Sequence, residues 1–383
     1  MNAVDSVVGM RWGDYVLDHG ADLRDWWRTH FGERGRSVLY ILAKGFDRRM
    51  CWGLETLLDA GKMGQRDVGL VEFDEGPASP SRQYCALVEA NWRELQRLMK
   101  GVGNIIRRPI QMRSTDGRRI TARSAGGAFR DVRELSQYTD IVLDISAMPR
   151  TVYFPIMAKI LYLLDGKRGT NPGGVTNFHV FVWEDAELDN QIRDDGVDEK
   201  AKYVHPFQGR MDRESAEGQP KVWMPLLGEG QLLQLDRIHS LVTPDETCPV
   251  LPSPATNPRR GDNLILEYRE FLFDQIRVEP QNFIYASEEN PFEVYRQLSR
   301  AIRRYHESFG PLGGARFALS ALSSKLMSVG ALLAAYDLKG RGIDVAIAHI
   351  ECQGYVLDQD ATGEVDKSKG KPFGLWVAGE CYD

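Results

Sequence analysis

Continuous apolar runs that alternate with helix-periodic segments constrain the fold of this chain more than any other feature. Two such runs are Ser37-Val-Leu-Tyr-Ile-Leu-Ala and Asp140-Ile-Val-Leu-Asp-Ile-Ser. A strand that is apolar on both faces is typical of a parallel sheet with helices on both sides. Strands that alternate with helices therefore predict an α/β fold with mostly parallel sheets.

The alternation occurs twice in the 383 residues, a length typical of two or three domains. We expect two Rossmann-like units, with a helical lead-in at 1–35, a first unit at 36–185, an insertion and linker at 186–245, and a second unit at 246–383. The turn Gly45-Phe-Asp-Arg-Arg aligns with Thr256-Asn-Pro-Arg-Arg, and Asp144-Ile-Ser-Ala-Met-Pro-Arg aligns with Leu319-Ser-Ala-Leu-Ser-Ser-Lys. This agreement predicts an internal duplication in which Arg150 and Lys325 occupy equivalent turns.

Composition and charge exclude several classes of protein. Hydrophobic residues make up 43% and charged residues 27% of the chain, which excludes a disordered or fibrous protein. A net charge of −6 argues against a general nucleic-acid coat protein. The apolar stretch around Tyr153–Leu164 contains a lysine and is too short to span a bilayer, so we expect no membrane association.

The 5 cysteines and 7 histidines are scattered and form no CxxC, HExxH or HxH motif. We therefore expect a reducing, cytoplasmic setting without disulfides, a structural zinc site or a cofactor.

The turns that follow the predicted strands hold the candidate ligand-binding residues, because ligands of open parallel sheets bind outside the carboxyl ends of the strands. Small hydroxyl residues and cations at helix starts suit an anionic ligand. The candidates are Ser146, Arg150, Ser323, Ser324, Lys325, Arg48 and Arg259. The alternative is that Ser146 and Ser324 are helix N-caps and that the cations are solvated.

Three carboxylates at predicted strand ends suggest a second possibility. Asp47, Asp74 and Asp144 could converge, hold Mg²⁺ and act as catalytic residues in phosphodiester chemistry. In the structural alternative, Asp47 pairs with Arg48 or Arg49, and Asp144 caps its own turn.

An arginine-rich stretch follows the second predicted helix of the first unit. It contains Arg107, Arg108, Arg113, Arg118, Arg119 and Arg123, with a predicted hairpin turn at Thr115-Asp-Gly. The stretch is either a nucleic-acid contact or a solvated hairpin.

The pattern Asp144-x-Ser146-x-x-x-Arg150 between a strand and a helix resembles the ligand-binding turn of the CRISPR-associated Rossmann-fold (CARF) family. Leu322-Ser-Ser-Lys resembles the same turn in its Gly-Thr-Lys form, with Ser323-Ser324 in place of the glycine pair. Two such units in one chain are similar to the SAVED domain of bacterial anti-phage systems. The resemblance implies an oligonucleotide signal bound across a pseudo-two-fold cleft, with Ser146, Arg150, Ser324 and Lys325 on its phosphates.

These observations favour a sensor-type protein that binds a nucleotide or oligonucleotide, as a subunit of a bacterial antiviral defence complex. We expect its effector activity to lie on a protein partner. The first alternative is a metal-dependent phosphodiesterase or nuclease, the one reading that involves Mg²⁺. The second is a non-catalytic scaffold subunit that binds only proteins.

Overall fold

The protein has an α/β fold with two sheets of mostly parallel strands. The computed structural model describes residues 9–32, 35–61, 64–76, 79–166, 176–211, 218–358 and 366–382. It divides into a first unit, the described parts of Tyr15–Gly196 and Cys352–Asp383, and a second unit, the described parts of Met1–Asp14 and Val197–Glu351.

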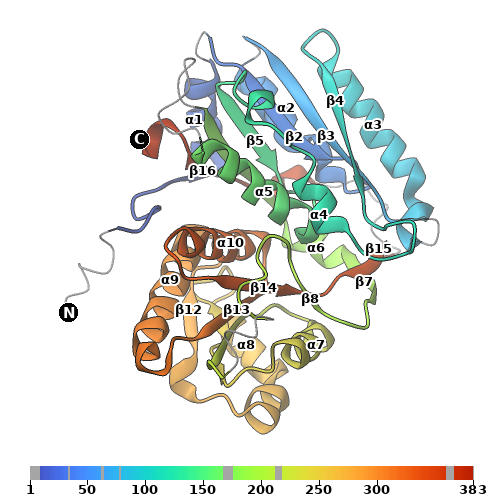
Figure 1. The fold of residues 1–383 in the computed structure, drawn as a ribbon. Coiled ribbons are helices and arrows are strands. Elements are labelled where there is room, and N and C mark those ends of the chain that lie inside the picture. The colour runs from blue at the N-terminus through green and yellow to red at the C-terminus, as the bar shows by residue number, and fades with distance from the viewer. Residues whose placement is uncertain are drawn as a thin grey trace. The chain divides into compact units, whose positions relative to one another are not determined.

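The first unit contains a 7-stranded sheet in the order β1-β16-β6-β5-β2-β3-β4 (Figure 1). Its strands are β1 (Val16–His19), β2 (Val38–Ala43), β3 (Arg66–Asp74), β4 (Ile105–Gln111), β5 (Asp140–Asp144), β6 (Asn177–Glu184) and β16 (Lys371–Ala378). The strands from β2 to β6 are parallel, and β16 adds to β6 in the antiparallel sense. A separate two-stranded sheet pairs β7 (Ile192–Val197) with β15 (Cys352–Leu357).

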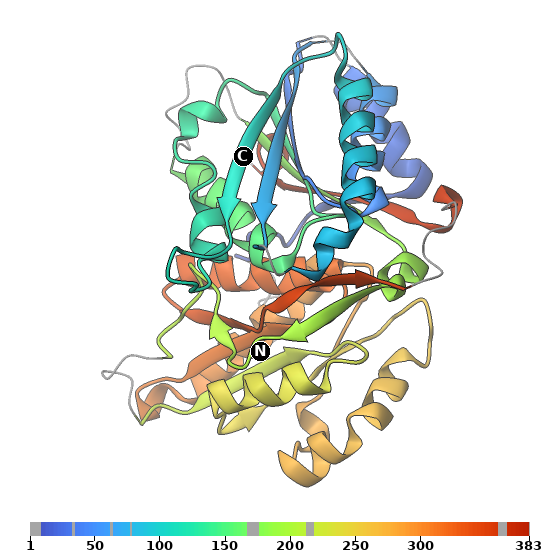
Figure 2. The same ribbon diagram turned by 90° about the vertical axis from the view of Figure 1, so that its right-hand side faces the viewer.

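Helices cover both faces of this sheet, as the apolar strands predict. They are α1 (Gly20–Gly32), α2 (Trp52–Ala60), α3 (Cys85–Met99), α4 (Thr121–Gly126), α5 (Arg150–Asp165) and α6 (Ala186–Gln191), with 3₁₀ turns η1 (Arg48–Cys51), η2 (Pro80–Tyr84), η3 (Val132–Glu134), η9 (Lys367–Lys369) and η10 (Glu380–Tyr382). Figure 2 shows α1 and α3 on one face and α4 and α5 on the other. The core of the first face includes Trp27, Tyr40 and Phe181.

The second unit contains a sheet in the order β12-β11-β9-β13-β14-β8, with β10 paired to β9. Its strands are β8 (Lys202–Tyr203), β9 (Lys221–Leu226), β10 (Glu246–Thr247), β11 (Val250–Pro252), β12 (Ile284–Ala286), β13 (Arg316–Ala321) and β14 (Val345–His349). Its helices are α7 (Leu232–Val242), α8 (Arg260–Glu267), the π-helical η5 (Glu270–Gln275), α9 (Pro291–Ser308) and α10 (Lys325–Gly340), with 3₁₀ turns η6 (Pro280–Asn282) and η7 (Gly310–Leu312). Helices α7 and α8 pack on one face of the sheet, and α9 and α10 lie on the other (Figure 1).

Five parallel strands of each unit follow the same order; the two-residue β10, which is also parallel to β9, is not counted among them. Taken along the chain, the third, second, first, fourth and fifth strands are neighbours in β4-β3-β2-β5-β6 and again in β12-β11-β9-β13-β14. This is the doubly wound order of Rossmann folds. The duplication itself stays a prediction, because unrelated doubly wound sheets also share this order.

The predicted unit boundaries differ from those in the structure. The lead-in at 1–35 is not separate, since β1 and α1 belong to the first unit. The first unit also takes residues from 352 onward, because β16 pairs with β6. Strand β9, which we placed in the linker at 186–245, lies inside the second sheet and is the first of its parallel strands along the chain.

Because the predicted second unit left out β9, the sequence alignment paired two turns that follow different strands. Residues 256–260 follow β11, the second strand of their unit, whereas Gly45–Arg49 follows β2, the first strand. These two turns are therefore not equivalent. The other pair is equivalent, because Arg150 opens α5 after the fourth strand and Lys325 opens α10 after the fourth strand.

Among the described residues, no helix has the length and apolar character that crossing a membrane requires.

The close packing of α9 on α10 generates a stability prediction. A Cβ added at Gly330 would lie 2.4 Å from the carbonyl oxygen of Pro291 and 2.5 Å from Cβ of Val294. We expect Gly330→Ala to destabilise the second unit by about 1–3 kcal/mol, because overpacking outweighs the gain in helix propensity. Urea denaturation measures the change. Gly340→Ala is the matched control in the same helix, since an added Cβ there meets nothing within 4 Å. Equal stability of the two variants would contradict the packing argument.

Candidate functional site

The first unit reverses its strand order between β2 and β5, and ligands of open α/β sheets bind at the carboxyl ends of strands at such a switch point. Arg150 is the first residue of α5 at this edge. The helix has 16 residues, so its N-terminal amides add partial positive charge near the partly exposed Arg150. The turn before Arg150 is thus suited to an anion.

Asp144 and Ser146 hold this turn in place. Oδ2 of Asp144 accepts a hydrogen bond from the Tyr40 hydroxyl at 2.7 Å, and Oδ1 accepts one from the Ser146 amide at 2.9 Å. The structural alternative for Asp144 is therefore confirmed, because it caps its own turn. Oγ of Ser146 accepts a hydrogen bond from the Trp183 amide at 2.8 Å, and the residue is fully buried. Ser146 is not a helix N-cap, since Pro149 holds that position without a side-chain bond.

Asp47 is engaged by an arginine, as the alternative for it predicts. Its carboxylate accepts hydrogen bonds from the backbone and side chain of Arg49, and the ion pair measures 2.8 Å. Arg49 is buried and pairs with Asp189 as well. The side chain of Asp74 lies outside the described residues, so the convergence of three carboxylates stays a prediction. Neighbouring Arg48 is partly exposed on η1.

The second unit has its switch point between β9 and β13, where Lys325 opens α10. Ser324 is the N-cap of α10, because its hydroxyl accepts a hydrogen bond from the Met327 amide at 3.2 Å. The alternative for Ser324 is thus confirmed. Ser323 is buried, and its hydroxyl donates to the Met327 sulfur at 3.1 Å. Lys325 is partly exposed.

Two acidic groups balance Arg260, the first residue of α8, which follows β11 in the second sheet. Arg260 pairs with Glu229 at 2.7 Å and also with Glu288. Burial raises the pKa of Glu229, but the hydrogen bond and charge of Arg260 outweigh it and lower the pKa overall. Arg259 is exposed, and its amide donates to Asn257.

The arginine-rich stretch forms the predicted hairpin, with a bridge between Arg113 and Arg119 and a turn at Gly117. Five of its six arginines contact protein groups as follows. Arg107 pairs with Glu72, Arg108 with Glu134 and Arg118 with Asp116, whereas Arg113 and Arg119 donate to the carbonyl oxygens of Gly117 and Cys352. A nucleic-acid role for Arg107, Arg108, Arg113, Arg118 and Arg119 stays a prediction.

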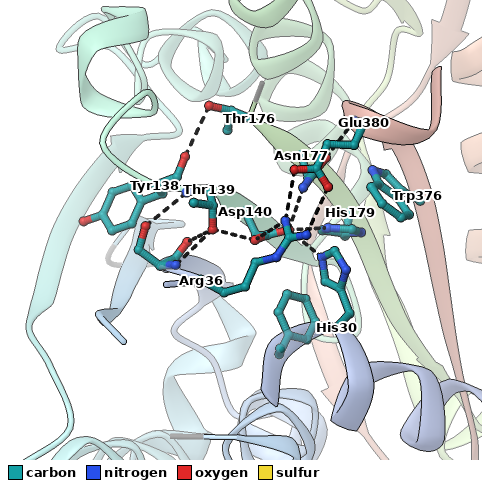
Figure 3. A network of polar contacts seen from close by, with 12 residues as sticks. His30, Arg36, Tyr138, Thr139, Asp140, Thr176, Asn177, His179, Trp376 and Glu380 are labelled. Atoms are coloured by element: carbon teal, nitrogen blue, oxygen red, sulfur yellow. Dashed lines mark hydrogen bonds and ion pairs between the residues drawn. The ribbon is translucent and has the colours of Figure 1, made fainter. Parts of the chain in front are cut away.

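A buried polar cluster lies at the opposite, amino edge of the first sheet (Figure 3). Its centre is Asp140, the first residue of β5. Oδ1 of Asp140 accepts hydrogen bonds from Nε2 of His30 at 2.8 Å and from Nε2 of His179 at 3.1 Å. It also accepts one from the side-chain amide of Asn177 at 3.1 Å. We call His30, Asp140 and His179 the His–Asp–His cluster.

The second carboxylate oxygen faces other partners. Oδ2 of Asp140 accepts a hydrogen bond from the Thr139 hydroxyl at 2.7 Å and lies 3.5 Å from the Arg36 guanidinium. Arg36 also pairs with Glu380 at 3.0 Å. Burial by itself raises the pKa of the Asp140 carboxyl, but the hydrogen bonds from His179 and His30 outweigh it, so the pKa lies well below its usual range.

Aromatic rings surround the two imidazoles. Trp26 stacks on His30 with ring centres 5.0 Å apart, and Trp376 lies 5.2 Å from His30 and 5.1 Å from His179. Within the part of the chain that the structure describes, the His–Asp–His cluster is the one set of three or more potential metal ligands that converge, with ligand atoms within 4.8 Å of one another. Sequence reasoning missed it, because His30 and Asp140 are 110 positions apart and no motif links them.

No family model and no curated protein matches the chain. The solved structures similar to it include a deacetylase triple mutant involved in the teicoplanin biosynthetic pathway. That similarity has 14% sequence identity, covers 44% of this chain and 76% of the deacetylase chain, and has a TM-score of 0.22. At this level it carries no conclusion about fold or function.

The His179 imidazole generates a prediction of pH-dependent stability. Burial lowers its pKa below the ordinary 6.5, and the hydrogen bond to Asp140 offsets this only in part. A second proton would sit on Nδ1, which is buried without a hydrogen-bond partner among the described residues. The unfolded chain binds that proton more readily. Stability contributed by neutral His179 is therefore lost as pH falls below 6.5, with a slope of up to about 1.4 kcal/mol per pH unit.

Thermal unfolding of the protein between pH 8 and pH 5 measures this loss. His179→Gln keeps a side-chain N–H for Asp140 but does not titrate, so we expect a flatter pH dependence for the variant. A parallel pH dependence of variant and wild type would refute the role of His179.

Proposed function

We propose that the chain binds a nucleotide-type ligand through phosphate contacts at the switch points of its two units. The observation that supports this most directly is the equivalence of Arg150 and Lys325. Each is the first residue of a 16-residue helix that follows the fourth strand of a doubly wound sheet. A cation at a long helix N-terminus, at the ligand-binding edge, is an arrangement suited to phosphate.

In this proposal, the two cations and backbone amides supply most of the anion recognition. The hydroxyls of Ser146, Ser323 and Ser324 each make hydrogen bonds inside the protein. Charge-assisted bonds from guanidinium or ammonium groups to phosphate are roughly twice as strong as neutral ones. Arg150 and Lys325 therefore carry the proposal, and the serines shape the turns that precede them.

The ligand class we favour is an oligonucleotide signal, on the strength of the resemblance of these turns to those of CARF and SAVED proteins. In this proposal the chain is a sensor subunit of a bacterial defence complex, and a protein partner carries the effector activity. Phosphodiesterase chemistry is less well supported, because Asp47 and Asp144 are both committed to internal contacts.

Two successive experiments test the identity of the ligand and its binding. Native mass spectrometry of the purified chain detects a co-purifying nucleotide. Calorimetric titration with ATP, a linear oligoadenylate and a cyclic dinucleotide then measures affinity. Loss of a charge-assisted contact is worth about 1.5–3 kcal/mol, so we expect Arg150→Ala and Lys325→Ala each to weaken binding by about tenfold to a hundredfold.

Each variant has a control in its own helix. Lys159→Ala removes a charge from α5 about 14 Å along the helix from Arg150, and Lys339→Ala does so near the end of α10. We expect wild-type affinity for both controls. Equal binding by all four variants would contradict the proposal that Arg150 and Lys325 contact phosphate. Absence of binding by wild type to every probe would favour the scaffold alternative.

A further inference from the structure

We propose that His30, Asp140 and His179 form a binding site for a divalent transition metal of the Zn²⁺ class. The site is separate from the proposed phosphate contact at Arg150, because the two lie at opposite edges of the first sheet: Asp140 begins β5, whereas Arg150 follows its carboxyl end.

The donor set fits such a metal. Two imidazole nitrogens and one carboxylate oxygen are ligands that Zn²⁺ and its neighbours in the first transition series bind well. Hard cations such as Mg²⁺ prefer oxygen ligands and water, which this cluster does not supply in number. The three residues come from α1, β5 and β6, so the fold rather than a local motif brings them together.

The distances fit as well. In a tetrahedral zinc site, with ligand bonds of about 2.0–2.2 Å, neighbouring ligand atoms lie about 3.3–3.5 Å apart. Nε2 of His30 and Nε2 of His179 lie 2.8 and 3.1 Å from the same oxygen of Asp140. Both distances are a few tenths of an ångström shorter than this, so the ligand atoms must separate slightly to admit the ion. Figure 3 shows the two imidazoles and Asp140 close together.

Arg36 does not block the site, because it faces Oδ2 rather than the shared Oδ1, and Glu380 neutralises it.

Neighbouring residues supply hydrogen bonds to one of the proposed metal ligands, Asp140. The Thr139 hydroxyl and the Asn177 amide both donate to the Asp140 carboxylate and orient it. Such outer partners typically tune affinity. Coordination through Nε2 moves the His179 proton to Nδ1, which has no hydrogen-bond partner among the described residues. We therefore expect an affinity below that of a fully supported zinc site, with water at the fourth position.

The test uses the full chain after dialysis against a chelator. Titration with Zn²⁺ by calorimetry, and with Co²⁺ by visible absorption, should give one site per chain. Saturation with Zn²⁺ at a hundred times the dissociation constant should raise the Tm of the first unit by about 5–10 °C. Asp140→Asn and His30→Gln should each weaken Zn²⁺ binding by at least about tenfold. The reason is that even the loss of an outer-shell partner typically weakens metal binding by about tenfold to a hundredfold.

His30→Gln separates a metal site from a purely hydrogen-bonded cluster, because glutamine still offers an N–H to Asp140. Circular dichroism confirms that the variant folds. His19→Gln, an exposed histidine of the same unit, is the control and should bind like wild type. Three results would each overturn the proposal: no saturable Zn²⁺ or Co²⁺ binding by wild type, wild-type binding by folded His30→Gln, or a thiolate-to-Co²⁺ charge-transfer band, which would place the ion on a cysteine.

Discussion

The buried carboxylate of Asp140 is the constraint on which the arrangement of the first unit depends. A buried charge is costly unless donors surround it. Its donors come from elements far apart along the chain, namely His30 in α1 and Asn177 and His179 in β6. Arg36 extends the network to Glu380, beyond the last strand. One carboxylate thereby fixes where a helix, two strands and the C-terminal segment meet, and removal of a donor leaves part of its charge without compensation.

Strand β5 connects this network to the opposite edge of the sheet. It begins at Asp140 and ends at Asp144, and both carboxylates are buried and hydrogen-bonded. The Asp144 carboxylate holds the turn that leads into α5, and Ser146 bonds that turn to β6 through the Trp183 amide. The position of Arg150 therefore follows from the anchoring of a single short strand at both ends. Gly53 of α2 allows this, because a Cβ there would collide with the Tyr40 hydroxyl.

Local patterns could predict the α/β class, most strand–helix pairs, the arginine hairpin and the equivalence of Arg150 and Lys325. Each of these features depends on contiguous residues that form an apolar run, a turn or the start of a helix. The unit boundaries could not be predicted, because β16 pairs with β6 from almost two hundred positions away along the chain. Strand β9 was also hard to predict, because it is short, contains Pro225 and lies between polar segments. The His–Asp–His cluster could not be predicted either, because His30 and His179 are isolated histidines in the sequence. Only the pairing of β5 with β6 and the docking of α1 bring them to Asp140.

The shared strand order of the two units does not extend to their chemistry. At the second switch point, Gly228 closely approaches the carbonyl oxygen of Leu322, and the nearby cation Arg260 is neutralised by Glu229 and Glu288. At the start of α5 the first unit has Arg150, and the planar guanidinium of arginine can bind a phosphate in bidentate fashion. Lysine, at the equivalent position in the second unit, acts as a point charge. In the proposed function, Arg150 would therefore select a phosphate by geometry, whereas Lys325 would attract it by charge alone.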